Sequence, residues 1–185
     1  MGFTSIISLL DSIGEKINIH IIHKLEETKK FIPNIISNHK NLNEINVFSF
    51  DRSFDHFPNV EKSHISEATY YRLFLEDYLR DDDFYVYLDA DVVCLDDPIP
   101  YIKSKIKLMG QNKIPIAAMK HEEILQNDQR SSKLGISNGN YFNAGVMVIN
   151  TRVWNKYCVK DQAIKIIKDK NEELYLWDQD VLNII

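Results

Sequence analysis

Hydrophobic runs and short polar segments alternate along the whole chain, and the spacing inside each run distinguishes strands from helices. Short apolar runs rich in β-branched and aromatic side chains predict strands at 17–22, 45–50, 84–91, 115–119 and 141–150. Hydrophobic residues at helical spacing predict helices at 6–13, 25–40, 66–79 and 151–170, and a short one that starts at 178. This alternation is typical of an α/β protein with a mostly parallel sheet.

The strand that begins at Phe84 is apolar on both faces and ends abruptly in two carboxylates, Asp89 and Asp91. Such a strand belongs in the centre of a covered sheet, and ligands of these sheets bind beyond the carboxyl ends of the strands. Carboxylates at a buried strand end are costly unless they are paired or bind a cation. Two hard oxygen ligands there suit a Mg²⁺ or Mn²⁺ ion that carries phosphates. The sequence therefore predicts metal-assisted handling of a phosphorylated or nucleotide-linked substrate.

The same D-x-D spacing occurs twice more, and position separates the three pairs. Asp81 and Asp83 precede their strand, at the wrong end for a ligand, and indicate a solvated turn. Asp178 and Asp180 open a helix, where acidic residues complement the helix dipole. Arg72, taken alone, lies off the apolar face of its helix and would be a surface cation. The small-residue step 143–145, taken alone, indicates a bulge in its strand or a close approach of another backbone segment.

Length, composition and charge narrow the class of protein. At 185 residues the chain fits one domain, and 44% hydrophobic residues are enough for a core. A net charge of −5, with no cluster of Lys and Arg with interleaved aromatics, argues against nucleic-acid binding. Cys94 and Cys158 stand alone, which fits a reduced, cytoplasmic protein. No apolar run approaches the ~20 residues that span a bilayer, so we expect at most peripheral contact with the inner membrane face.

Five short motifs, taken in order, are more specific than any single pair of residues. They are Ser5–Leu10, Ala68–Leu73, Tyr87–Asp91, Tyr141–Val146 and Asp178–Asn183. Together they resemble glycosyltransferase family 8 over nearly the whole chain. The resemblance implies a GT-A fold, which is Rossmann-like with helices on both sides of the sheet. It also implies a retaining, metal-dependent galactosyl- or glucosyltransferase that uses UDP-sugars, as bacterial lipooligosaccharide enzymes and glycogenin do.

The resemblance also implies roles for individual residues. Asp89 and Asp91 would hold Mn²⁺ (or Mg²⁺) on the donor diphosphate, and Asp89 would also reach the ribose. Arg72 would hold the phosphate and sugar of the donor, a role that suits its planar fork of donors. Asn143 and Ala144 would line the sugar pocket.

Three further residues take part in the implied site. Asp178 would bind hydroxyls of the donor sugar, Gln179 would lie at the reacting face beneath C1, and Ala90 would contact the donor. The acceptor would be a glycan or a lipooligosaccharide. Two catalytic carboxylates of glycosidase type are not evident, so a double-displacement nucleophile is unassigned. The long polar stretch 121–140 is expected to be a loop that covers the substrate.

Two parts of the family pattern are missing. Family members begin with a strand before the Ser-Ile-x-Ser-Leu helix, and that strand ends in Asp-x-x-Tyr, which contacts uracil. They also carry His-x-x-Gly-x-x-Lys-Pro-Trp, whose His is the third protein ligand of the metal, whereas no His follows His121 here. We therefore expect residues 1–185 to form one GT-A-like domain that lacks the first strand and the C-terminal motif of the family.

Two other interpretations are open at this stage. A haloacid-dehalogenase-type phosphatase uses D-x-D-x-[TV] after an apolar strand, which residues 89–93 match, with Asp89 as nucleophile and Asp91 as general acid/base. Against it, that motif normally opens the fold, and it leaves 143–145 and 178–180 without roles. The second alternative is an inactive family 8 fragment that binds nucleotide-sugar weakly.

Overall fold

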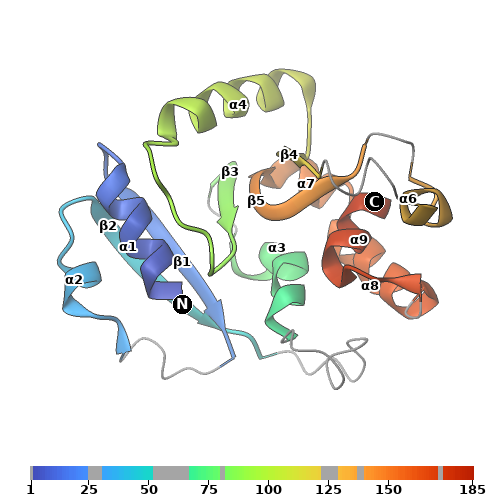
Figure 1. The fold of residues 1–185 in the computed structure, drawn as a ribbon, viewed down its shortest axis with the longest axis horizontal. Helices are drawn as coiled ribbons and strands as arrows, with labels where there is room; N and C mark the ends of the chain where they lie inside the picture. The colour runs from blue at the N-terminus through green and yellow to red at the C-terminus, as the bar shows by residue number, and fades with distance from the viewer. Residues whose placement is uncertain are drawn as a thin grey trace. The chain divides into compact units, whose positions relative to one another are not determined.

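Figure 1 shows the fold in the computed structural model of the chain. The described residues are 2–24, 31–51, 67–79, 82–121, 129–136, 140–170 and 173–185. The chain divides into two compact units, one formed by residues 1–53 and 88–107 and the other by residues 54–87 and 108–185. Because the chain passes between the units at three points, neither unit is a continuous stretch of sequence.

The first unit combines a pair of parallel strands with helices. Its N-terminal elements are α1 (Gly2–Ser12), β1 (Ile17–His23), α2 (Asn34–Ser37) and β2 (Leu42–Ser49). The strands β1 and β2 pair in parallel, with Ile17 opposite Leu42 and His23 opposite Ser49. Both strands predicted for this region are confirmed. Of the helix predicted at 25–40, α2 lies within the described residues, and residues 25–30 lie outside them.

The core of the first unit is formed by Leu10, Ile13 and Ile36, which are buried against one another. The buried Asn41 side chain donates from Nδ2 to the carbonyl oxygens of Leu10 (2.9 Å) and Ile13 (2.7 Å). The last carbonyl groups of a helix have no partners within the helix, so this amide satisfies two of them at the end of α1. The predicted opening helix is confirmed, with a side-chain cap from a residue distant in sequence.

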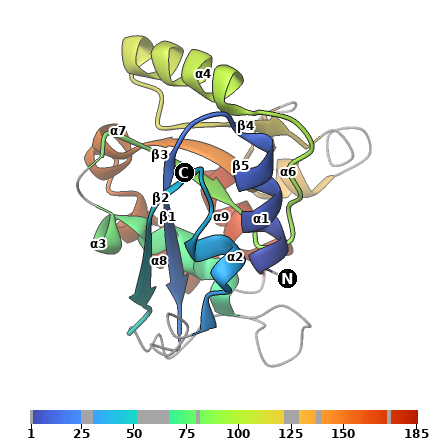
Figure 2. The same ribbon diagram turned by 90° about the vertical axis from the view of Figure 1, so that its left-hand side faces the viewer.

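The second unit is built around a three-stranded sheet with the order β3-β5-β4. Its elements are η3 (Glu67–Phe74), α3 (Leu75–Tyr78), β3 (Phe84–Leu88), β4 (Ile116–Lys120), α6 (Gln129–Lys133), β5 (Phe142–Asn150), α7 (Thr151–Lys156), α8 (Val159–Lys170) and α9 (Trp177–Ile184). The chain enters the first unit at Leu88, the last residue of β3. It returns to the second unit at Leu108, within α4 (Ile99–Asn112). β4 runs antiparallel to β5. Figures 1 and 2 show α9 beside β5, and α9 also contacts η3 and α8.

The predicted helix 66–79 differs from expectation in a way that matters for the site. Residues 67–74 form a 3₁₀ helix, which has three residues per turn, and only 75–78 are α-helical. Five consecutive residues of η3, Tyr70–Phe74, are buried. The prediction that Arg72 lies off the buried face is wrong, because η3 is enclosed on several sides and has no single apolar stripe.

The predicted helix 151–170 is two helices, α7 and α8, with a break at Cys158, whose φ is 49°. The core side of α8 is formed by Val159, Ala163 and Ile167, at helical spacing. Tyr157, the last residue before this break, is exposed.

No helix was predicted where the structure has α4, the longest helix of the described residues. Its start is marked by Asp97, whose Oδ1 accepts a hydrogen bond from the Ile99 backbone N–H (2.9 Å). The loop predicted at 121–140 contains the short helix α6, and residues 122–128 and 137–139 lie outside the described part. None of the helices that the structure describes has the length and apolar character needed to cross a membrane.

Candidate active site

The D-x-D pair lies in a turn directly after β3, in the first unit. The backbone N–H of Val92 donates to the carbonyl oxygen of Asp89 (3.2 Å), which closes this turn. The Asp89 side chain is half-buried, whereas Ala90 and Asp91 are exposed. A methyl group on Gly2 would lie 3.7 Å from Cβ of Ala90, an ordinary contact distance, so α1 begins close to the turn. The end of the predicted strand at Asp91 is corrected to Leu88, since 89–92 form the turn.

The segment that follows the D-x-D turn is fastened to α1 by two serines. Ser8 Oγ accepts a hydrogen bond from the Cys94 backbone N–H (3.0 Å), and Ser12 Oγ donates to the Cys94 carbonyl oxygen (3.3 Å). The α1 motif of the sequence therefore holds the segment beyond the two aspartates in place.

The chemistry of the D-x-D turn fits a hard divalent cation. Asp91 is exposed, and carboxylate oxygens such as those of Asp89 and Asp91 are the ligand type that Mg²⁺ and Mn²⁺ prefer. Within the described residues there is no group of three or more His, Cys, Asp or Glu side chains arranged to hold a metal. Asp89 and Asp91 could thus supply two ligands of a site that is completed by other groups.

The second unit holds the remaining predicted residues, and Arg72 lies at their centre. Its buried Nε lies 2.8 Å from Asp178 Oδ2 and donates to the Thr69 carbonyl oxygen (3.1 Å). Its Nη1 donates to the Ala144 carbonyl oxygen (2.6 Å), and its guanidinium carbon lies 4.5 Å from the centre of the Tyr87 ring. This one cation therefore connects η3 with α9, β5 and β3.

Asp178, at the start of α9, is buried and uses both carboxylate oxygens. Besides its ion pair with Arg72, it accepts a hydrogen bond from Thr69 Oγ1 at Oδ1 (3.0 Å). A buried charge is tolerated where it is paired and hydrogen-bonded. Arg72 and Asp178 are paired with each other, and both also form hydrogen bonds with Thr69, Arg72 to its carbonyl oxygen and Asp178 to its hydroxyl group. Thr69 received no role from the sequence, although it lies in the same motif as Arg72.

A bulge in β5 explains how the Ala144 backbone becomes available to the site. Along the ladder with β4, Ala118 faces Met147 but Met119 faces Asn143, so residues 144–146 are left out of the pairing. A bulge frees backbone groups from the ladder. The freed carbonyl of Ala144 accepts from Arg72, and its N–H donates to Gln179 Oε1 (2.9 Å). The bulge predicted at the small-residue step is confirmed.

Asn143 lies at the edge of this bulge with its side chain exposed. Its Oδ1 accepts a hydrogen bond from the Gly145 backbone N–H (2.8 Å). The side-chain oxygen thus stabilises the local turn of the bulge.

The orientation of the Gln179 amide follows from its neighbours. Tyr141 donates its hydroxyl hydrogen to Asp180 Oδ1 (2.5 Å), because a carboxylate can only accept. The Tyr141 oxygen then accepts from Gln179 Nε2 (3.4 Å), and Oε1 is left for the Ala144 N–H. Burial raises the pKa of Tyr141 well above its usual value, and the bond to Asp180 raises it further, so the phenol remains a donor.

Asp180 shapes the turn that leads into α9. Its Oδ2 accepts from the backbone N–H groups of Tyr175 and Leu176, both at 2.7 Å. Trp177, which follows, has a φ of 45°, a left-handed conformation that is strained for a side chain of this size. Successive helical residues point 100° apart, so Asp180, two residues after Asp178, points about 200° away from it. Asp180 therefore stabilises the turn before α9 and does not contact Arg72. That angular separation is the sequence signal that distinguishes the two roles.

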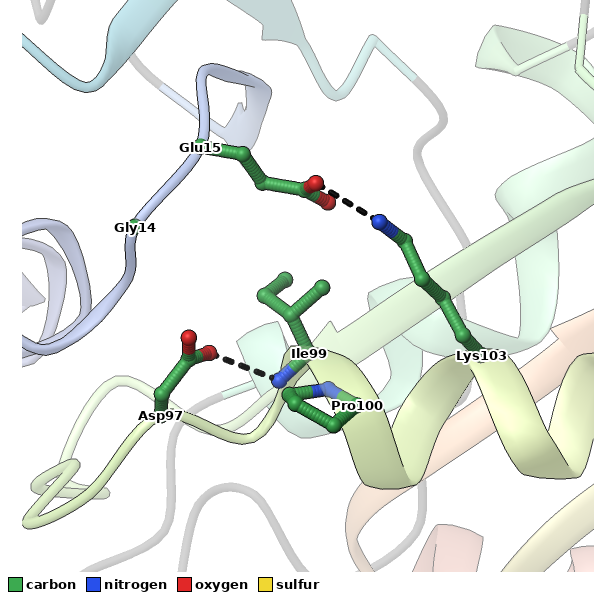
Figure 3. Close-up of a pocket in the computed structure, with 6 residues that line it drawn as sticks. All are labelled: Gly14, Glu15, Asp97, Ile99, Pro100 and Lys103. Atoms are coloured by element: carbon green, nitrogen blue, oxygen red, sulfur yellow. Dashed lines mark hydrogen bonds and ion pairs between the residues drawn. The ribbon is translucent and has the colours of Figure 1, made fainter.

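The structure brings four of the predicted residues into direct contact: Arg72, Ala144, Asp178 and Gln179. With Tyr141 and Asp180 they form what we call the buried polar network. Asp89, Ala90 and Asp91 belong to the other unit. An open hollow of about 360 Å³ in the first unit, lined by Gly14, Glu15, Asp97, Ile99, Pro100 and Lys103, contains none of the predicted residues (Figure 3).

Comparison with known proteins places these features in a family. Residues 3–185 match the family model described as glycosyl transferase family 8. General stress protein A of Bacillus subtilis is 32% identical over 130 residues, which cover 68% of this chain and 43% of that protein. The lipopolysaccharide 1,3-galactosyltransferase of Salmonella typhimurium is 36% identical over 124 residues, which cover 63% of this chain and 35% of that protein.

Solved structures agree with the sequence relatives. Two crystal structures of LgtC, one of an active-site mutant and one of the galactosyltransferase with donor and acceptor sugar analogues, superpose with TM-scores of 0.82 and 0.76. Each is 25% identical to this chain and covers 99% of it, and the chain covers 64% of LgtC. The chain thus spans about half or less of the two curated relatives and under two thirds of LgtC. The GT-A fold prediction is confirmed, and the chain belongs to glycosyl transferase family 8.

Proposed function

We propose that this chain carries the donor-sugar site of a hexosyltransferase. The enzyme would transfer galactose or glucose from a UDP-sugar to a glycan acceptor of the lipopolysaccharide or lipooligosaccharide class, with retention of the anomeric configuration. Support comes from the family match, from the relative named as a lipopolysaccharide galactosyltransferase and from the LgtC complex with sugar analogues. The expected cytoplasmic location is part of the same proposal.

The observation that carries the proposal is the fixed amide of Gln179. Because Tyr141 and Ala144 determine which end is Nε2 and which is Oε1, the remaining amide hydrogen and oxygen lone pair have defined directions. Preorganised dipoles of this kind stabilise charge that develops at a reacting centre. Gln179 would present its amide to the reacting carbon of the donor sugar.

The residues around Gln179 would bind the donor. Asp178 is oriented by Arg72 and Thr69 and would bind hydroxyls of the donor sugar. Arg72 would act on the donor through the Asp178 carboxylate and the Ala144 carbonyl that it holds. Asn143 and Ala144 would line the sugar pocket.

Asp89 and Asp91 would hold the divalent cation, Mn²⁺ or Mg²⁺, and Ala90 would contact the donor between them. When bound, such a cation neutralises charge on a departing nucleotide diphosphate as a Lewis acid. The two carboxylates would accept the metal with little rearrangement, because they lie in a closed turn whose following segment is anchored to α1.

A phosphatase of the haloacid-dehalogenase type accounts for fewer observations. It would use Asp89 and Asp91 and would leave the contacts of Gln179 and Asp178 without a function. The family match also favours the transferase. Cleavage of a simple phosphomonoester without any nucleotide would reopen the phosphatase interpretation.

The test is a thermal-unfolding titration with UDP and Mn²⁺, followed by sugar transfer from UDP-galactose and from UDP-glucose. Ligand at about 100 times its Kd should raise the free energy of unfolding by about 2.7 kcal/mol. We expect this stabilisation to need both UDP and metal and to be lost in Asp89→Asn. Asp96→Asn is the matched control, because it removes one exposed carboxylate from the same loop.

Each result has a definite meaning. Stabilisation by UDP and metal without sugar transfer would identify a chain that binds the donor but is inactive. A folded chain whose unfolding temperature does not change when UDP and Mn²⁺ are added would contradict the proposed function.

A further inference from the structure

Asn183 ends the motif 178–183, and its side chain makes three hydrogen bonds. Its Nδ2 donates to the carbonyl oxygens of Phe142 (2.9 Å) and Gln179 (2.8 Å), and its Oδ1 accepts from the Phe142 backbone N–H (2.7 Å). Exchanging the oxygen and nitrogen would place Oδ1 against two carbonyl oxygens, which cannot donate. These partners therefore determine the orientation of the Asn183 amide.

The two bonds to Phe142 occupy backbone groups that point away from β4. The carbonyl oxygen of Tyr141 accepts from the N–H of His121, which follows β4 (3.0 Å). Backbone groups of successive residues in a strand point to alternate sides, so those of Phe142 face the other way. Asn183 satisfies both of them with one donor and one acceptor, as the backbone of a neighbouring strand would. The amide thus ties α9 to the first residue of β5.

The third bond places Asn183 over the turn of α9 that carries Gln179. The two residues are four positions apart, so their side chains project from the same face of the helix. A helical side chain leans toward the preceding turn, which brings the Asn183 amide to the Gln179 carbonyl. Because Gln179 Oε1 accepts from the Ala144 N–H, α9 is bonded to β5 at two points.

The spacing of these two points matches along the helix and along the strand. Four residues of an α-helix rise about 6 Å, and two residues of a strand rise about 6.6 Å. Asn183 with Phe142 and Gln179 with Ala144 can therefore be bonded at the same time. A shift of α9 along β5 by one residue would break both contacts. Together they define the register of α9 on β5, and Asn183 supplies two of the three bonds.

We propose that Asn183 is a positioning residue for sugar transfer, because it sets the register of α9 on β5 and so holds the Gln179 amide beside the bulge at Ala144. The consequence for catalysis rests on the proposed function, whereas the register is a property of the fold. Asn183 would act through Gln179 and would not bind the donor. A catalytic group displaced by about 1 Å can lower a rate on the order of a hundredfold.

The first test compares sugar transfer by Asn183→Ala and Asn150→Ala. Asn150 is the matched control, because this buried Asn lies at the other end of β5 and its side chain accepts from the Val153 N–H at the start of α7 (3.3 Å). We expect Asn183→Ala to lower kcat on the order of a hundredfold with little change in KM for the UDP-sugar. Asn150→Ala should lower the unfolding temperature and leave kcat unchanged.

A second variant separates the bridge to β5 from the bond inside α9. The hydroxyl of Asn183→Ser can still donate to the Gln179 carbonyl four residues earlier, but it is one atom too short to bond Phe142 as well. This variant should therefore lose as much kcat as Asn183→Ala. Recovery of kcat in Asn183→Ser, or an equal loss in Asn183→Ala and Asn150→Ala, would overturn the inference.

Amide hydrogen exchange tests the register without any enzymatic activity. The Ala144 N–H donates to Gln179 and not to Asn183, so it should lose protection in Asn183→Ala only if Asn183 holds Gln179 in place. The same N–H should stay protected in Asn150→Ala. Unchanged exchange at Ala144 in Asn183→Ala would overturn the inference. Loss of that protection, in a chain whose unaltered form transfers no sugar, would contradict the proposed function and support the register.

Discussion

The two groups of predicted site residues differ in how much the protein itself occupies them. In the buried polar network every side chain is held by another element, and Arg72 and Asp178 are both almost fully enclosed. In the D-x-D turn, Asp91 is exposed and Asp89 half-buried. The two groups of residues therefore differ in how strongly the protein fixes their side chains. The protein itself holds the side chains of the buried polar network in place, whereas the Asp91 carboxylate is exposed to solvent.

The strongest test of this comparison is to break the ion pair in the network. Arg72→Met should lower the free energy of unfolding by about 3–5 kcal/mol, because it leaves the Asp178 charge buried and unpaired. Denaturant unfolding measures the loss. The double variant Arg72→Met/Asp178→Leu should recover much of it, since both charges are removed together. A single variant within about 0.5 kcal/mol of the unaltered chain would contradict the description of the network as a tightly coupled unit.

A second charged cluster in the same unit sharpens the comparison. Lys160 lies 2.8 Å from Asp77 and 3.0 Å from Glu76, and all three side chains are largely buried. Lys160→Met should lower the free energy of unfolding by about 2 kcal/mol at neutral pH, because the two carboxylates then lose their counter-charge.

The pH dependence of this cluster has a defined sign. The hydrogen bond to Asp77, more than that to Glu76, raises the pKa of Lys160. A raised pKa in the folded state gives stability that is complete below the usual lysine value of 10.5 and is lost as the pH rises through the folded value. Unfolding curves between neutral and strongly alkaline pH should show this loss, and Lys160→Met should reduce it. An unchanged alkaline decline in the variant would assign the decline to other groups.

A smaller effect is expected where the network meets the turn before α9. Tyr141→Phe removes the hydrogen bond to Asp180 and should lower the free energy of unfolding by about 1–2 kcal/mol. It also removes the acceptor for Gln179 Nε2, so under the proposed function it should lower kcat more than it raises KM for the donor. Tyr175→Phe is the matched control, because that ring is exposed. Equal effects of the two variants would mean that the phenol does not orient the amide.

The smallest change in stability is expected at the D-x-D turn. Asp91→Asn should alter the free energy of unfolding by no more than about 0.5 kcal/mol, because the side chain is exposed. The same substitution should weaken Mn²⁺ binding, which isothermal titration measures. A large loss of stability in Asp91→Asn would contradict the conclusion that the D-x-D turn contributes less to stability than the buried polar network.

The sequence predicted the strands and the chemistry-bearing residues better than it predicted burial. The strands could be predicted because short runs of apolar, β-branched residues are typical of strands, as at 84–88 and 142–150. The burial of Arg72 was not visible, because its partner Asp178 follows more than a hundred residues later. A local apolar stripe cannot reveal an enclosure made by α9 and β5.

Other misses have equally local causes. The break at Cys158 depends on a left-handed residue that is not glycine, so no sequence signal marked it. Helix α4 lacked the charge pattern of a typical amphipathic helix, yet its isoleucines recur at helical spacing from Ile99 to Ile106. The role of Tyr141 depends on the direction of one hydroxyl group, which only the structure provides.

The two serine contacts to Cys94 also have an entropic consequence. From the end of β3 at Leu88 to Cys94, only residues 89–93 lie between fixed points, and one turn bond already constrains them. Ordering a free residue costs about 1–2 kcal/mol, so a loop tied at both ends has little disorder left to lose when it takes up a ligand. Under the proposed function, α1 would therefore contribute to ligand affinity by restricting the conformations of the unliganded loop.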